Sequence, residues 1–206
     1  MKIITHFSST AFRDGKSAPR FIVNVLCTAL AYLTIHTHTV WPNLITDITQ
    51  AFQADLEQAI CLLRILRYMA EDCDNEQIVV EESIKESYFA FLDSHARQHI
   101  FLNIFNQWAL NIPSLPPQSD PNKITFLQNR LMDTFLSWVK LSLPKEVFEN
   151  MLTDNAAMIN LIFEQLTSED EDNVQVAVNC IVELLQLSRN ERNNFGAFQT
   201  VVMSKV

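Results

Sequence analysis

Apolar residues along most of this chain recur at intervals of three and four, the period of an α-helix with one side in a core. In the first such stretch they form two adjacent rows: Phe21, Val25, Ala29 and Leu33, and Ile22, Leu26 and Leu30. So wide a stripe predicts a helix that is covered by neighbours on two sides. No stretch alternates apolar and polar residues as a half-buried strand would, so we expect an all-α protein.

Short polar residues and prolines predict where the helices begin. Asp55 and Asp154 suit the N-cap position, where a side-chain oxygen accepts from a free backbone N–H. Asp120 followed by Pro121 combines a capping residue with a first-turn proline, and Pro19 likewise suits the first position of the first helix.

Further signals for the start and end of helices lie in the last third of the chain. Ser168 and Glu171 form the Ser-x-x-Glu pattern of a capping box, which predicts that another helix starts there. Pro144 is expected to end the preceding long helix and to open a short turn that runs to Phe148.

The stretch 77–110 contains neither glycine nor proline. It predicts either one long helix or two helices with a soft junction near residues 94–98. The clearest loop follows at residues 111–121, which carry four prolines.

A similar local pattern recurs in several of these helices, and each copy is followed by a break and a second amphipathic helix. The copies are marked by Leu26, Leu62, Leu131 and Asn179. Paired helices that recur about every 40–47 residues are typical of HEAT and armadillo arrays, in which each pair buries its apolar face against its neighbours. We therefore expect an α-α superhelix, a HEAT/armadillo-like solenoid of antiparallel helix pairs, with a compact irregular bundle as the alternative. We expect residues 1–206 to form a single solenoid segment of about four helix pairs, near residues 18–53, 55–110, 120–166 and 168–206.

Composition narrows the function classes. Only two glycines, Gly15 and Gly196, occur in 206 residues, which disfavours folds that need glycine in phosphate loops and positive-φ turns. The formal net charge of −9 argues against a nucleic-acid groove, because such a groove needs Lys and Arg to displace counterions. The longest apolar run is broken by Asn24 and Thr28, so no membrane span is expected.

Cysteine and histidine positions favour packing over chemistry. Cys27, Cys61, Cys73 and Cys180 form no C-x-x-C pair, and we expect reduced core thiols in a reducing compartment. His36 and His38 are expected to be a capping or surface pair at a helix end.

No catalytic residue, cofactor or metal is expected. His95 and His99 lie one helical turn apart, but the chain lacks the glutamate of His-Glu-x-x-His, and Arg97 between them disfavours a cation. Neither G-x-x-x-x-G-K nor G-x-S-x-G occurs. An α-helical enzyme is therefore the weakest of the functional hypotheses.

Particular residues at the start of the chain resemble a known family. A helix and the entry to its partner resemble the second repeat of importin-β-like nuclear transport receptors, in particular the transportin-SR and importin-thirteen group: Val23, Leu26, Cys27, Ala29, Leu30, Ala31, Leu33, Trp41, Leu44 and Ile45. Residues 62–72, 135–139 and 155–163 are similar to later segments in the same order, although the family's proline is missing from the first of them. The likeness runs from about residue 18 to residue 187.

The resemblance implies a karyopherin segment that works by binding. Its implied partners are the Ran GTPase, protein cargo and Phe-Gly nucleoporins, with no direct nucleic-acid or membrane binding, and it would shuttle between nucleus and cytoplasm. It also implies a fragment from the N-terminal half of a longer receptor, which agrees with apolar residues such as Ile3, Ile4 and Val201 near both ends. The alternative is a HEAT or armadillo scaffold or adaptor subunit of a stable cytoplasmic complex.

In such receptors the second helix of each pair lines a concave surface. Acidic residues on the expected second helices are the candidate contacts with basic surfaces of Ran or cargo: Asp47, Glu76, Glu81, Glu82, Glu86 and Asp93. Glu82 and Glu86 lie one turn apart on one face and make the best cluster with Glu81. A solvated helix face is the alternative interpretation for each of them.

Overall fold

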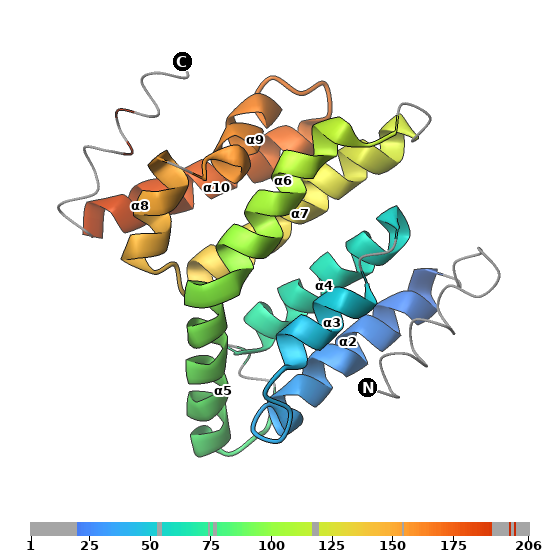
Figure 1. Cartoon of the computed structure of the whole chain (residues 1–206), viewed down its shortest axis with the longest axis vertical. Helices are drawn as coiled ribbons and strands as arrows, with labels where there is room; N and C mark the ends of the chain where they lie inside the picture. The colour runs from blue at the N-terminus through green and yellow to red at the C-terminus, as the bar shows by residue number, and fades with distance from the viewer. Residues whose placement is uncertain are drawn as a thin grey trace. The chain divides into compact units, whose positions relative to one another are not determined.

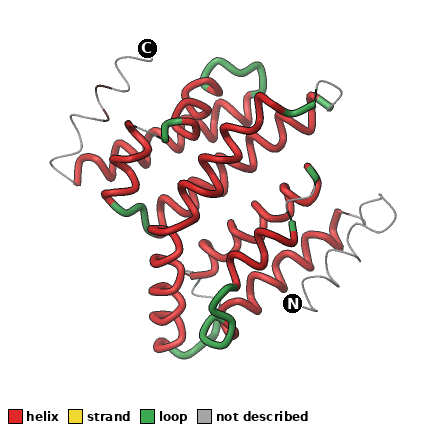
Figure 2. The backbone as a smooth tube through the Cα atoms, viewed as in Figure 1, coloured by secondary structure: helices red, strands yellow, loops and turns green. Residues whose placement is uncertain are grey.

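A computed structural model describes residues 20–52, 55–73, 75, 78–116, 120–153, 155–190, 198 and 200. All regular structure in these residues is helical, which confirms the expected all-α class (Figures 1 and 2). The α-helices are α2 (Arg20–Thr37), α3 (Leu44–Ala51), α4 (Leu56–Cys73), α5 (Glu82–His95), α6 (Gln107–Asn111), α7 (Pro121–Leu141), α8 (Lys145–Thr153), α9 (Ala157–Gln165) and α10 (Glu171–Asn190). A π-helix, η2 (Ala96–Asn106), precedes α6, and a 3₁₀ turn, η3 (Ile112–Ser114), follows it.

Contacts divide the chain into two compact units, residues 1–92 and 93–206. In the first unit the most extensive helix packing joins α2 to α4, and in the second it joins α7 to α10. Each of these four helices is the first member of an expected pair, so neighbouring first helices pack together within each unit, as they do in a stacked array. The expected boundaries of the four pairs remain a prediction.

The central helix of the first unit is α4. Ten of its 18 residues are buried, which requires cover on more than one side. The shorter α3 adds one apolar face through Leu44, Ile45 and Ile48. The sequence forms these helices because their apolar residues recur every three or four positions.

One end of α2 is held to α5 by polar contacts. Thr34 Oγ1 and Tyr88 Oη are 2.6 Å apart, and the imidazole of His38 lies 2.9 Å from the Ser87 hydroxyl through Nε2. Of the capping or surface pair expected at this helix end, His38 takes the capping role, because its Nδ1 lies 2.8 Å from the Ile35 carbonyl oxygen in the last turn of α2, and its side chain is buried. The chain turns after Thr37, which carries His38 inward against α5, while His36 stays exposed.

Aromatic rings fill the core of the second unit. Phe135 of α7 makes edge-to-face contacts with Phe101 and Phe105 of η2, with ring centroids 5.7 Å apart in both pairs. Helical structure runs without a break from Glu82 to Ser114. The expected soft junction therefore takes the form of a change in helix type at Ala96, and the wider π-helical turn alters which side chains share a face.

Two predicted N-caps are confirmed. Asp55 Oδ1 accepts from the Gln58 backbone N–H at 2.9 Å, and Asp120 Oδ1 accepts from Asn122 N at 3.0 Å. Pro121 is the first residue of α7, as expected.

The predicted cap of α10 is wrong in its residue. Asp170, rather than Ser168, accepts from Asn173 N through its carboxylate at 2.9 Å, and α10 starts at Glu171. Ser168 Oγ instead accepts from Asp170 N at 3.2 Å. A hydroxyl that bonds the residue two positions on makes a local turn, and this turn presents Asp170 to the helix.

The short turn expected after Pro144 is a helix, α8. Val147, Phe148, Met151 and Leu152 are buried on one face of it, a stripe that repeats after four residues. Pro144 still begins the element, since its carbonyl accepts from Phe148 N at 3.0 Å.

A free backbone N–H at the start of α9 finds its hydrogen-bond acceptor in another helix. Asn106, buried at the end of η2, accepts from Met158 N through Oδ1 at 3.1 Å. The predicted cap Asp154 lies outside the described residues, as do Pro19 and the apolar segment before it. Of the apolar residues near the C-terminus, Phe198 is described, and its ring is buried 5.7 Å from that of Phe148.

The first helix has an open face, which corrects the expectation that its stripe is covered on two sides. Phe21 and Val25 are 68% and 62% exposed, while Val23, Cys27 and Leu30 are buried. Among the described helices α2 packs chiefly on α4, and a single principal neighbour covers one side of a helix.

Candidate protein-binding surfaces

Three of the predicted acidic residues lie together at the start of α5. Glu81, Glu82 and Glu86 are all exposed. The Glu81 carbonyl accepts from Ile84 N at 2.9 Å and from Lys85 N at 3.2 Å, so Glu81 precedes the first turn and Glu82 begins it. Negative charges near the start of a helix lie at the positive end of its dipole, which stabilises the helix. The cluster is available to a basic partner, and it also serves α5 itself.

Two other predicted residues have polar partners within the fold. Asp47 Oδ2 accepts from the indole N–H of Trp41 at 2.6 Å, which holds Trp41 against the first turn of α3. Asp93 accepts from the hydroxyl of Ser142, the residue that ends α7. Both carboxylates are half-buried, and Glu76 lies outside the described residues.

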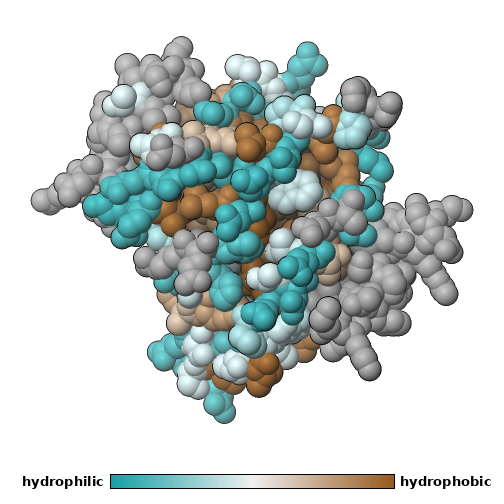
Figure 3. Space-filling view, viewed as in Figure 1, coloured by the Kyte–Doolittle hydropathy of each residue, from teal (hydrophilic) through white to brown (hydrophobic). Residues whose placement is uncertain are grey.

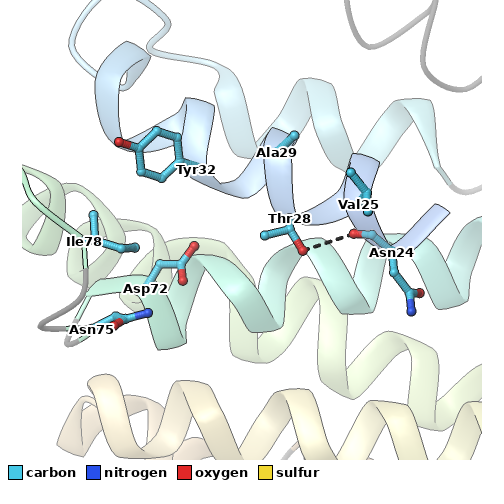
Figure 4. A pocket seen from close by; sticks show the side chains of 8 residues that line it. All are labelled: Asn24, Val25, Thr28, Ala29, Tyr32, Asp72, Asn75 and Ile78. Carbon is cyan, nitrogen blue, oxygen red and sulfur yellow. Dashed lines mark hydrogen bonds between the residues drawn. The ribbon is translucent and has the colours of Figure 1, made fainter. Parts of the chain in front are cut away.

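A groove between α2 and the end of α4 was not anticipated. It has a volume of about 600 Å³ and is lined by Asn24, Val25, Thr28, Ala29, Tyr32, Asp72, Asn75 and Ile78. Figure 4 shows Tyr32, Ile78 and Asp72 gathered toward one end of it, with Val25 and Asn24 toward the other. The signal in the sequence is the stripe that includes Val25 and Ala29, whose outer half stays exposed beside the described helices.

Asp72 is the charged group in this lining. Burial raises its pKa above the usual value for a carboxyl, a hydrogen bond with the Asn75 side chain opposes the rise, and Glu71 adds to it. The described residues place no cation in a salt bridge with Asp72. This carboxylate is therefore partly desolvated without a compensating charge.

A second hollow, between α7 and α10, is polar. It measures about 250 Å³ and is lined by Asn122, Thr125, Phe126, Asn129, Arg130, Asp170, Asp172 and Asn173. The amide of Asn173 is buried and donates to Gln165 Oε1 at 2.8 Å, while its Oδ1 has no hydrogen-bond partner in the structure. Arg130 lies over the Phe126 ring at 4.9 Å.

The four cysteines are free and buried, as expected of core residues. Cys27 Sγ lies 4.0 Å from the Cys61 carbonyl oxygen, and Cys180 Sγ lies 3.5 Å from that of Met132. A hydrogen bond with Cys61, together with burial, raises the pKa of Cys27, and burial raises the pKa of Cys180. Cys27 and Cys180 therefore stay protonated at neutral pH and are poor nucleophiles.

Of the two histidines considered for a metal, His99 bonds a neighbour on its own helix through one ring nitrogen. His99 Nδ1 is 2.9 Å from Asn103 Nδ2, and burial, followed by the influence of His95, lowers the His99 pKa. Across the part of the chain that the structure describes, His, Cys, Asp and Glu do not gather in threes as a metal site would need. No helix in those same residues is long and apolar enough to cross a membrane.

The exposed acidic turn of α5 and the α2–α4 groove are the candidate binding surfaces of the described residues. On the face seen in Figure 3, hydrophilic and hydrophobic residues lie side by side. The packing of first helices on one another defines the class as a helical-repeat protein, and proteins of this class bind other macromolecules on extended surfaces.

A family model described as Exportin 1-like protein matches residues 19–181, which is most of the chain. The chain belongs to the exportin 1-like family. This family covers the N-terminal region of importin-β superfamily proteins, which is a HEAT-type α-solenoid. The chain is thus a segment of a karyopherin nuclear transport receptor and has no catalytic role, which confirms the superfamily and the binding class expected from sequence. Searches of curated proteins and of solved structures found no match.

Proposed function

We propose that this segment belongs to a receptor of the transportin-SR and importin-thirteen group, which carries protein cargo between nucleus and cytoplasm under the control of Ran. The observation that supports a transport role is the exportin 1-like match over residues 19–181. The narrower group rests on the run of matching residues between Phe21 and Trp41. Phe-Gly nucleoporins would guide its passage through the pore.

The contact with Ran or with a basic cargo is assigned to Glu81, Glu82 and Glu86. Their exposed carboxylates lie within the first two turns of α5, and neither of the salt bridges seen among the described residues involves them. Charges of this kind raise the association rate and select partners by complementary potential. Asp47 and Asp93 suit the role less well, because each already accepts a hydrogen bond within the fold.

The test of the proposed function compares purified Ran loaded with GTP and with GDP. Immobilised chain should retain the GTP form more strongly, because a Ran-controlled receptor distinguishes the two states. Equal retention of both forms, or of neither, would count against the receptor and favour the scaffold or adaptor alternative.

A charge-removing variant locates the contact. Replacement of Glu81, Glu82 and Glu86 by Gln should weaken binding of GTP-loaded Ran about tenfold, since three exposed ion pairs contribute on the order of 0.5 kcal/mol each. Gln keeps the size of Glu but removes the charge that favours the start of α5, so thermal unfolding of the variant must show that α5 still folds.

The matched control carries the same three changes at exposed positions of the second unit: Glu149→Gln, Glu164→Gln and Glu169→Gln. This control should bind like the original chain. An equal loss in both triple variants would mean that total charge matters and that the α5 cluster is no contact site.

A further inference from the structure

The open face of α2 concentrates large exposed apolar side chains. Phe21, Val25 and Tyr32 are 68%, 62% and 42% exposed. They follow one another at spacings of four and seven, so they lie along one side of the helix. Single exposed apolar residues are ordinary, whereas a row that borders a groove marks an interaction site.

The groove beside this row has a mainly apolar lining with one carboxylate toward one end. Val25, Ala29, Tyr32 and Ile78 supply the apolar walls, and Asp72 stands among them (Figure 4). A hydrophobic pocket with a few placed polar groups is the usual form of a specific binding site.

The charge of the groove lining indicates what kind of ligand would bind there. The lining contains no Lys or Arg. Of the cations beside it, Arg64 donates to Asn24 Oδ1 and Lys85 donates to the Asn75 carbonyl at 3.5 Å, so each already has an acceptor other than Asp72. A partly desolvated carboxylate with no counter-charge is stabilised by an incoming cation. The occupant must therefore bring both apolar side chains and a positive charge to Asp72.

We propose that the α2–α4 groove docks a peptide segment of another protein that carries two large apolar side chains and a Lys or Arg. The apolar side chains lie over Val25, Ala29 and Tyr32, and the cation pairs with Asp72. A second copy of this chain is a poorer occupant, because two chains of net charge −9 repel each other. The site is separate from the acidic cluster of α5, so it goes beyond the proposed Ran contact.

The experiment pans phage that display random 16-residue peptides against the whole chain. Enriched peptides should share two large apolar residues spaced by three or four positions together with a Lys or Arg. Enrichment of peptides that lack a cation, Phe-Gly sequences among them, would overturn the proposal, as would the absence of any enrichment.

Affinity measurements on an enriched peptide then test each half of the groove. Asp72→Asn should weaken binding about fivefold, and replacing the peptide's cation by norleucine should cost the same, with no further loss when the two changes are combined. Val25→Asp should weaken binding more than tenfold, whereas Val182→Asp, at a similarly exposed valine of α10, should have no effect. Insensitivity to Asp72→Asn would overturn the proposal even if a Val25 variant failed to fold.

A photoreactive phenylalanine at position 25 identifies the occupant directly. Cross-links should form to the peptide. Cross-links to residues 1–19 of the same chain, or to a second copy, in the presence of saturating peptide would contradict the proposal. The variant with Glu81, Glu82 and Glu86 replaced by Gln should still bind the peptide, which separates failure here from failure of the Ran proposal.

Discussion

The pair α2–α4 in the first unit and the pair α7–α10 in the second are built alike inside. In each, a buried cysteine thiol of one helix points to a backbone carbonyl of the other, Cys27 toward Cys61 and Cys180 toward Met132. A small polarisable side chain at this position lets two helices approach closely. The shared arrangement is what repeated units of one array would share.

The two pairs differ in the hollow beside them. The one at α2–α4 is apolar with a single carboxylate, while the one at α7–α10 is lined mainly by amides, carboxylates and Arg130. The inner faces that stack the helices are thus similar, and a few outer positions decide what each pair can bind. Packing and recognition are set by different residues of the same helices.

The largest expected effect comes from a substitution in the buried core, measured against one on the exposed face of α2. Phe135→Ala removes a fully buried ring that contacts two others, and it should lower the free energy of unfolding of the second unit by about 3–5 kcal/mol. Val25→Ala on the open face of α2 should change the stability of the first unit by less than about 0.5 kcal/mol. Urea titrations that follow each unit measure both.

A large loss of unfolding free energy in Val25→Ala would contradict this contrast between the buried core and the exposed face of α2. It would mean that the face of α2 is covered when the protein is in solution, and that the groove is part of a core.

A smaller effect is expected at the helix start that the sequence misassigned. Asp170→Ala should destabilise the second unit by about 1 kcal/mol, because it removes the acceptor for Asn173 N at the head of α10. Ser168→Ala should cost less, since its hydroxyl bonds only the neighbouring turn. Thermal unfolding shows which of the two variants is less stable. A greater loss of stability in Ser168→Ala would mean that Ser168 caps α10 after all.

Much of this fold can be predicted from local sequence. The caps at Asp55 and Asp120 and the helices that follow depend on residues within one turn of each other, and a pattern of that range is visible in the chain. Competition between near neighbours is harder to predict, because Ser168 and Asp170 both suit a cap and geometry selects one.

Features that depend on distant residues were missed. The burial of His38 depends on Ser87, about fifty positions along the chain, and the start of α9 depends on Asn106. The candidate site divides in the same way. The exposure of Glu81, Glu82 and Glu86 follows from a polar helix face, but the bonds of Asp47 to Trp41 and of Asp93 to Ser142 are tertiary contacts.

We propose that this karyopherin segment recognises Ran through the first unit. Hydrogen–deuterium exchange of the whole chain with GTP-loaded Ran tests it most directly, since protection reports where a partner lies. We predict slower exchange in the first turns of α5, no change in α10, and no protection when Ran carries GDP. Protection confined to the second unit, or the same with either nucleotide, would contradict the account.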